Sequence, residues 1–272
     1  MILVNGVETG VVDATDRGIA YGDGIFRTFA VRDGQPEHWV RHAAKLAADC
    51  SVIGLRCPDK ILLEQDIARV CRAEPFSVLK ILVTRGPAAR GYSYASESMP
   101  TRIVLSSPLP NYPQTYARAG VRVRVCALRL GAQRVLAGVK HLNRLENVLA
   151  RAEWSDPDTA EGILRDTAGN IISGTMTNVF VVKGEKLVTP TLIECGVAGV
   201  TRQRVLEAAA RNGVECEVRK LSLDEVVAAD EIFLTNSIAG VWPVRELEGQ
   251  GYAPGALTRA AQDWLRDDDA PS

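Results

Sequence analysis

Residues 138–151 read Gly138-Val139-Lys140-His141-Leu142-Asn143-Arg144-Leu145-Glu146-Asn147-Val148-Leu149-Ala150-Arg151 and form the most informative segment of the chain. Its apolar side chains fall at helical spacing, at Leu142, Leu145, Val148 and Leu149. Gly138 interrupts whatever element precedes it. The pattern therefore predicts a helix that begins just after Lys140, behind the strand-like run 121–130.

Lys140 would then lie beside the positive end of that helix, which disfavours a protonated amine. A lysine held neutral in this way acts as a nucleophile toward a carbonyl group. Because most lysines are solvated, the spacing alone favours an ordinary surface lysine beside a helix. The rest of the sequence has to separate these two interpretations.

The composition is that of an ordinary globular protein. The chain has 272 residues, of which 46% are hydrophobic and 24% charged, with a net charge of −1, and its length allows two domains. This charge gives no electrostatic reason to expect nucleic acid or an anionic membrane as a partner. The first residues lack a signal peptide's basic region, and no apolar run has membrane-spanning length. The six cysteines contain no C-x-x-C pair, so we expect reduced thiols in a cytoplasmic protein.

Residues 1–107 are predicted to form a smaller α/β domain. Short apolar runs predict strands at 1–4, 26–31, 78–84 and 102–106, and amphipathic segments predict helices at 39–53 and 60–73. Three prolines between positions 108 and 113 deny both helix and sheet pairing, so residues 108–114 are the predicted linker.

Residues 115–272 are predicted to form a larger second domain. Strands are expected at 121–125, 162–165, 178–182, 186–189, 231–235 and 241–245, with a hairpin turn at 183–185. Helices are expected at 202–211, 223–227 and 257–266. The fold class is therefore α/β in the broad, α+β sense.

Several short motifs carry chemistry only in context. Residues 196–202 precede a helix, whose first amides bind phosphate well, although a plain helix cap is the alternative. Arg90 lies in a loop after a strand, where an arginine clamps a planar carboxylate or is simply solvated. His38 and His42 have metal-ligand spacing but no third ligand nearby in sequence, so no metal site is predicted.

The segment from Lys140 to Glu146 resembles the cofactor-lysine segment of the fold-type IV pyridoxal-phosphate family, in the form found in lyases that act on 4-amino-4-deoxychorismate. Motifs of that family follow in matching order from Asn5-Gly6 through Pro243-Val244. The resemblance implies a two-domain fold with pyridoxal 5'-phosphate between the domains, and a homodimer. It also implies conversion of the substrate to 4-aminobenzoate and pyruvate for folate synthesis.

The resemblance assigns roles to individual residues. It implies that Lys140 holds the cofactor and removes the substrate proton, with Thr28 as a proton relay. It implies cofactor contacts for Lys45, Ser173, Val200, Thr201 and Ser237, and substrate contacts for Arg27, Arg90 and Tyr92.

Three of these positions depart from the family's pattern. Lys45 replaces an arginine that contacts the cofactor phosphate, so a two-pronged contact becomes a point charge. Ser173 stands where relatives usually place a glutamate bonded to the pyridine nitrogen. Arg27 stands where members often carry glutamate.

Two other functions remain open at the level of sequence. A branched-chain or D-amino acid aminotransferase has the same fold, although branched-chain aminotransferases carry glycine at the Thr28 position. A ligand-binding homologue that has lost catalysis is the alternative of a different class. The retained Lys140, Arg90 and Thr28 argue against it.

Overall fold

The structure is a computed structural model that describes residues 1–95 and 97–269, and its chain divides into two compact units. The first unit comprises Met1–Asn111 and Val139–Asn143, and the second comprises Tyr112–Gly138 and Arg144–Ser272. The change of unit between Asn111 and Tyr112 falls in the proline-rich segment. Residues 139–143, which the sequence analysis assigned to the larger domain, group with the first unit because they pair with one of its strands.

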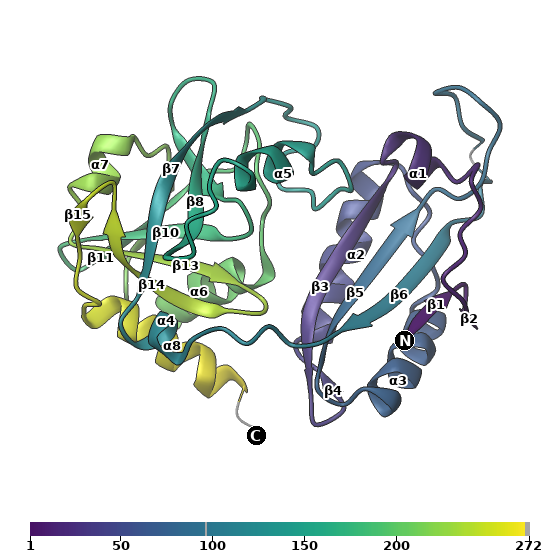
Figure 1. Cartoon of the computed structure of the whole chain (residues 1–272), viewed down its shortest axis with the longest axis horizontal. Helices are drawn as coiled ribbons and strands as arrows, with labels where there is room; N and C mark the ends of the chain where they lie inside the picture. The colour runs from purple at the N-terminus through teal and green to yellow at the C-terminus, as the bar shows by residue number, and fades with distance from the viewer. Residues whose placement is uncertain (96, 270–272) are drawn as a thin grey trace. The chain divides into compact units, whose positions relative to one another are not determined.

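The first unit is an antiparallel sheet backed by helices. Its strands lie in the order β2-β1-β6-β5-β3-β4, with β1 (Ile2–Val4), β2 (Val7–Glu8), β3 (Gly24–Arg32), β4 (Gln35–Pro36), β5 (Ser77–Thr84) and β6 (Thr101–Ser107). The helices are α1 (Arg17–Tyr21), α2 (Trp39–Val52) and α3 (Lys60–Ala73). Helices α2 and α3 lie behind the sheet in Figure 1, where α2 packs on β3 and α3 on β6. Leu46, Phe29 and Leu79 are fully buried between them.

The second unit is built on a mixed sheet whose main path is β12-β11-β10-β13-β14-β7-β8-β9, with β15 paired to β14. Its strands are β7 (Val121–Leu130), β8 (Thr159–Asp166), β9 (Ile171–Gly174), β10 (Asn178–Lys183), β11 (Lys186–Pro190), β12 (Cys216–Arg219), β13 (Glu231–Asn236), β14 (Gly240–Leu247) and β15 (Gln250–Gly251). Its helices are α4 (Gln114–Arg118), α5 (Leu145–Arg151), α6 (Val200–Arg211), α7 (Leu223–Val227) and α8 (Ala256–Asp269). Strand β7 runs parallel to β8 and β14, and β11 runs parallel to β12.

The prediction for the segment around Lys140 was wrong. The helix begins at Leu145, not just after Lys140, and has only 7 residues. Residues 140–142 are instead extended alongside β3: the Phe26 N–H donates to the Lys140 carbonyl (2.9 Å) and the Leu142 N–H to the Gly24 carbonyl (2.9 Å). The positive end of a helix therefore does not explain how Lys140 is activated.

The apolar stripe of that segment faces outward. Leu145, Val148 and Leu149 on α5 are exposed by 68%, 60% and 53%, while Ala150 is fully buried. Ala150 thus packs against the core, while the Asn147 side chain donates to the Thr175 carbonyl (2.8 Å). The spacing that predicted a buried face instead leaves three large apolar side chains uncovered in the isolated chain.

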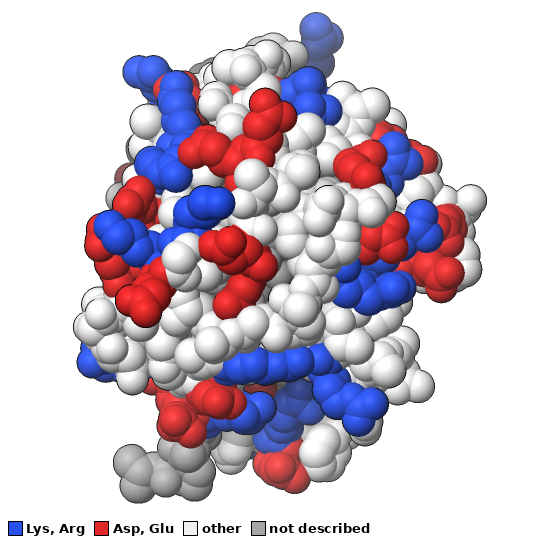
Figure 2. Space-filling view, turned by 90° about the vertical axis from the view of Figure 1, so that its left-hand side faces the viewer, with Lys and Arg blue, Asp and Glu red and all other residues white. Residues whose placement is uncertain are grey.

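The surface carries both signs of charge. Figure 2 shows Lys and Arg side chains intermingled with Asp and Glu over much of the visible face, which agrees with a net charge of −1. Among residues 1–95 and 97–269, no helix is both long and apolar enough to span a lipid bilayer.

Candidate active site

Lys140 is held by two elements of the first unit. Its backbone N–H donates to the Asp49 carboxylate on α2 (3.0 Å), and its carbonyl accepts from Phe26 on β3. Its amine nitrogen lies 4.5 Å from the centroid of the Phe26 ring. The backbone on both sides of the side chain is therefore fixed, and the amine rests on an aromatic face.

Thr28 lies on the same face of β3 as this amine. Successive side chains of a strand point to opposite faces, so Phe26 and Thr28 share one face. The burial pattern of β3 agrees, because Arg27 and Phe29 are buried while Phe26 and Thr28 are half-buried. This placement supports the proton relay that the resemblance implies, which stays a prediction.

Arg27 points the other way, toward α2. Its side chain is 2% exposed and forms an ion pair with Asp49, and it also donates to the Lys45 carbonyl (3.1 Å). Burial lowers the pKa of the guanidinium, and Asp49 partly offsets this effect. The expected substrate contact of Arg27 is therefore replaced in this structure by a role inside the domain.

Lys45 meets the same carboxylate from one helical turn away. Its ammonium forms an ion pair with Asp49, and the Lys45 side chain is 25% exposed. Burial lowers the pKa of Lys45 below its usual value, and the hydrogen bond to Asp49 offsets only part of this effect. A partly exposed cation beside Lys140 fits an anionic cofactor group, and the phosphate contact itself stays a prediction.

The loop that carries Arg90 and Tyr92 is tied to α1. The Arg17 guanidinium donates to the carbonyls of Gly91 (2.8 Å), Tyr92 (3.1 Å) and Ser93 (3.3 Å). Arg90 is exposed, and Tyr92 is exposed by 85% with its ring 5.4 Å from that of Tyr21. The loop backbone is thus fixed while both predicted substrate contacts remain open to solvent.

Asp23, in the motif Gly22-Asp23-Gly24, organises this loop. Its carboxylate accepts from Arg17 (2.8 Å) and from Arg85 (2.9 and 3.1 Å). Burial works to raise the pKa of Asp23, but the two arginines outweigh it and hold the pKa below its usual value. Gly22 ends α1 in the left-handed conformation (φ 63°), which favours glycine.

The second unit contains a set of groups suited to a phosphate. Helix α6 begins at Val200 after the N-cap residue Gly199, which has no side chain of its own to occupy the first amides. The Thr201 hydroxyl of this first turn lies 3.3 Å from the Ser237 hydroxyl, which follows β13. Two hydroxyls and the amides of a helix N-terminus are donors that bind phosphate. The residues present therefore fit the phosphate of pyridoxal phosphate.

Asn178 fixes the approach to this helix. Its side-chain oxygen accepts from the Gly199 N–H (3.2 Å) and its amide donates to the Val197 carbonyl (2.8 Å). A Cβ at position 199 would lie 2.3 Å from that oxygen, so any larger residue there would displace the Asn178 side chain. Asn178, the last residue of the motif Ser173-Gly174-Thr175-Met176-Thr177-Asn178, thereby sets the position of the first turn of α6.

Ser173 is 7% exposed on β9, at the start of the same motif. The turn that follows it is held by Glu161, which is fully buried on β8. This carboxylate accepts from the N–H groups of Thr175 (3.0 Å) and Met176 (3.0 Å) and from the Thr177 hydroxyl (3.1 Å). Glu161 is thus committed to the turn that follows Ser173.

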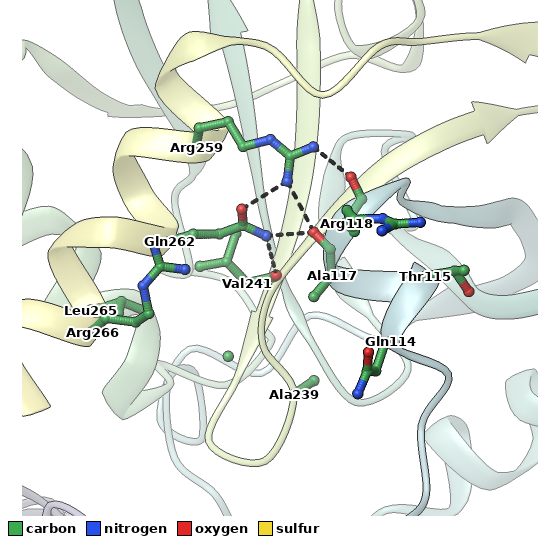
Figure 3. A pocket seen from close by; sticks show the side chains of 11 residues that line it. Gln114, Thr115, Ala117, Arg118, Ala239, Val241, Arg259, Gln262, Leu265 and Arg266 are labelled. Atoms are coloured by element: carbon green, nitrogen blue, oxygen red, sulfur yellow. Dashed lines mark hydrogen bonds between the residues drawn. The ribbon is translucent and has the colours of Figure 1, made fainter.

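A pocket of the second unit, shown in Figure 3, lies between α4, β14 and α8. Arg259 of α8 donates to the carbonyls of Ala117 and Arg118, and Gln262 donates to Ala117 (2.7 Å) and Val241 (3.2 Å). These polar side chains join the helix to α4 and β14. The residues lining the pocket include none of the predicted site residues.

Within residues 1–95 and 97–269, no group of three or more His, Cys, Asp or Glu side chains could hold a metal ion. His42 is buried, with its ring 4.9 Å from that of Phe29. It is therefore part of the core behind β3.

The chain belongs to the class IV aminotransferase family, whose family model matches residues 24–247. Members of this family are pyridoxal-phosphate enzymes, which confirms the cofactor expected from the sequence. The two-domain fold expected from the sequence is confirmed as well. The chain is 35% identical to the aminodeoxychorismate lyase of Vibrio harveyi, over 96% of this chain and 98% of that protein. It is also 45% identical to the 4-amino-4-deoxychorismate lyase of Pseudomonas aeruginosa, whose crystal structure matches with a TM-score of 0.95 over 98% of this chain and 99% of that one.

Aminotransferases of the same family are similar as well. The D-alanine aminotransferase of Bacillus licheniformis is 30% identical over 94% of this chain and 90% of that protein. Full-length similarity to both activities means that the family alone does not choose between them.

The structure adds two residues that the sequence analysis missed. Asp49 could have been noticed, because it follows Lys45 at the i, i+4 spacing typical of a helical ion pair. Glu161 gave no such signal, since its partners lie 14 to 16 residues further along the chain. Only the folded sheet brings that carboxylate to the turn.

Proposed function

We propose that this protein is a pyridoxal-phosphate-dependent lyase that converts 4-amino-4-deoxychorismate to 4-aminobenzoate and pyruvate. The observation that carries the proposal is the 45% identity and TM-score of 0.95 with a lyase of this name over 98% of the chain. Lys140 with its amine over Phe26, and Thr28 on the same strand face, fit the proton transfers that such a lyase needs.

In this proposal each part of the chain has a distinct task. Lys140 holds the cofactor through its amine, while the first turn of α6 with Thr201 and Ser237 binds the phosphate. Lys45 adds a positive charge, and Ser173 hydrogen-bonds the pyridine nitrogen. The bound cofactor supplies the electron sink for the carbanion that forms at the amine-bearing carbon.

The proton transfers fall to two side chains of the first unit. Once the substrate amine has displaced Lys140 from the cofactor, the freed Lys140 nitrogen would remove the ring proton at the amine-bearing carbon, acting as a general base. Thr28 or the same lysine then gives a proton to the departing three-carbon group. Arg90 clamps a substrate carboxylate with two hydrogen bonds, and Tyr92 lines the same loop. Release of an aromatic product drives the reaction forward.

The test is direct. Purified protein with bound cofactor is incubated with 4-amino-4-deoxychorismate, and 4-aminobenzoate and pyruvate are measured in the same samples. The two products should appear in equal amounts and depend on the cofactor. Transamination of D-alanine or branched-chain amino acids without 4-aminobenzoate would establish the aminotransferase alternative, and cofactor binding without turnover would establish a non-catalytic homologue.

We further propose that the protein forms a homodimer and works in the cytoplasm, in folate synthesis. The uncovered apolar side chains of α5 support the dimer, because a contiguous exposed apolar surface is typical of an interface. Light scattering should give about twice the 29.4 kDa chain mass. Val148→Lys on α5 should shift the protein toward the monomer, whereas Val11→Lys, at a similarly exposed position of the first unit, should not.

A further inference from the structure

We propose that Asp49 is a positioning residue that fixes both Lys140 and Lys45 for the cofactor. The roles of these two lysines rest on the proposed function. The inference beyond it is that one buried carboxylate, which does not itself contact cofactor or substrate, sets the place of both.

Asp49 is the meeting point of three groups from separate parts of the first unit. Its side chain is 1% exposed and forms ion pairs with Arg27 of β3 and Lys45 of α2. The same oxygen that pairs with Arg27 accepts the Lys140 backbone N–H at 3.0 Å, 91 residues away in sequence. The carboxylate thus ties helix α2 to the segment that carries the reactive lysine.

Lys45 is fixed at both its backbone and its ammonium. Arg27 donates to the Lys45 carbonyl (3.1 Å), and Asp49 holds the ammonium one helical turn further along α2. A lysine ammonium on a flexible stem has no preferred direction of its own, unlike the planar fork of an arginine. Asp49 supplies that direction at this position.

Position 49 requires a carboxylate, because its partners need two acceptor oxygens and a negative charge. One oxygen serves Lys45, while the other serves Arg27 and the Lys140 N–H. An asparagine of the same shape has one acceptor oxygen, and its NH2 group would face one of these donors. Asp49→Asn therefore cannot satisfy both sides, and it leaves a buried positive charge without its counter-ion.

The experiment measures cofactor affinity without substrate. Apoprotein is titrated with pyridoxal phosphate, and the visible absorbance of the lysine-bound cofactor is followed. Asp49→Asn should raise the dissociation constant by about tenfold or more. Asp66→Asn is the matched control, because Asp66 is also buried in the first unit, where it forms an ion pair with Arg102 (2.7 Å). The control should lower the melting temperature and leave the dissociation constant unchanged.

A second variant separates positioning from stability. Arg27→Met combined with Asp49→Asn removes the unpaired guanidinium, so the melting temperature should recover while cofactor affinity stays weak. An affinity equal to that of the parent in either Asp49 variant would overturn the proposal, as would an equal loss in Asp66→Asn. Because no substrate is present, these outcomes do not depend on whether the protein produces 4-aminobenzoate.

Discussion

Glu161→Gln tests whether one buried carboxylate holds the motif between Ser173 and Asn178. In the parent protein this side chain is fully buried and accepts hydrogen bonds on both oxygens. One oxygen accepts from the N–H groups of Gly162 (2.9 Å) and Thr175 (3.0 Å). The other accepts from the Met176 N–H (3.0 Å) and the Thr177 hydroxyl (3.1 Å).

The cost of the substitution follows from these partners. A glutamine keeps one acceptor oxygen, and its NH2 group must face the donors on the other side. The Thr177 hydroxyl can rotate to accept from that group, but the Met176 N–H cannot. Leaving the partly buried Met176 N–H unpaired costs about 1 kcal/mol, and the bonds that remain lose their charge assistance. We expect a total of about 3 kcal/mol, which lowers the melting temperature of a unit of this size by about 6–12 °C.

Calorimetry of the apoprotein measures this change, with Glu185→Gln in the exposed β10–β11 turn as the control. The control should melt within a degree or so of the parent. Glu161→Gln should also bind pyridoxal phosphate more weakly than the parent. The turn that Glu161 holds leads to Asn178, which fixes the first turn of α6. A melting temperature for Glu161→Gln equal to that of the control would refute this account of the motif.

Four further outcomes follow from the site. Lys140→Ala should abolish both the visible absorbance of the bound cofactor and the lyase activity, and borohydride reduction with peptide mapping should label Lys140 in the parent; label on another lysine would refute the assignment. Arg90→Lys keeps the charge but loses the planar fork, a loss of roughly 1.5–3 kcal/mol, so kcat/KM should fall by about ten- to a hundredfold with the absorbance intact; an unchanged kcat/KM would remove Arg90 from the site. Ser173→Glu should increase transamination of alanine, because a carboxylate keeps the pyridine nitrogen protonated; a parent that already transaminates as fast as it makes 4-aminobenzoate would contradict this explanation of Ser173. A hydrogen bond from Cys50 lowers the pKa of Cys57 to about 7, so the rate of Cys57 alkylation should rise as the pH passes that value. If the rate instead rises near the ordinary thiol pKa of about 8.5, or if Cys50→Ala leaves its pH dependence unchanged, this hydrogen bond does not act.

Part of the fold could be predicted from the sequence. Helices α3 and α7 have the predicted bounds, and the short apolar run at 26–31 lies within β3. Helix α7 has only 5 residues, but Ser222 and Glu225 form a capping box at its start. The five-residue helices α1 and α4 have no such box and show no periodicity, so they escaped prediction. Elements of this length are formed by their tertiary contacts, such as those of Arg17 with the loop after β5.

The segment around Lys140 shows a different limit. Its spacing correctly indicated a helix but gave neither its first residue nor the direction of its apolar face. Spacing is a property of one segment, whereas burial depends on what packs against it. Leu145 and Val148 are exposed despite their spacing, and the pairing of Lys140 with β3 joins residues more than a hundred positions apart.

The structure explains how a lysine can stand at position 45, where the family's pattern has an arginine. An arginine there would reach an anionic ligand with a rigid, two-pronged group, whereas Lys45 brings a single charge on a flexible stem. Asp49 restricts that stem from the same helix, and Arg27 balances the charge of Asp49 from the sheet. A carboxylate this deeply buried is stable only when it is paired, so the three residues act as one group. The loss of geometric definition at Lys45 is therefore offset within the domain, and the same carboxylate transmits that order to the backbone of Lys140.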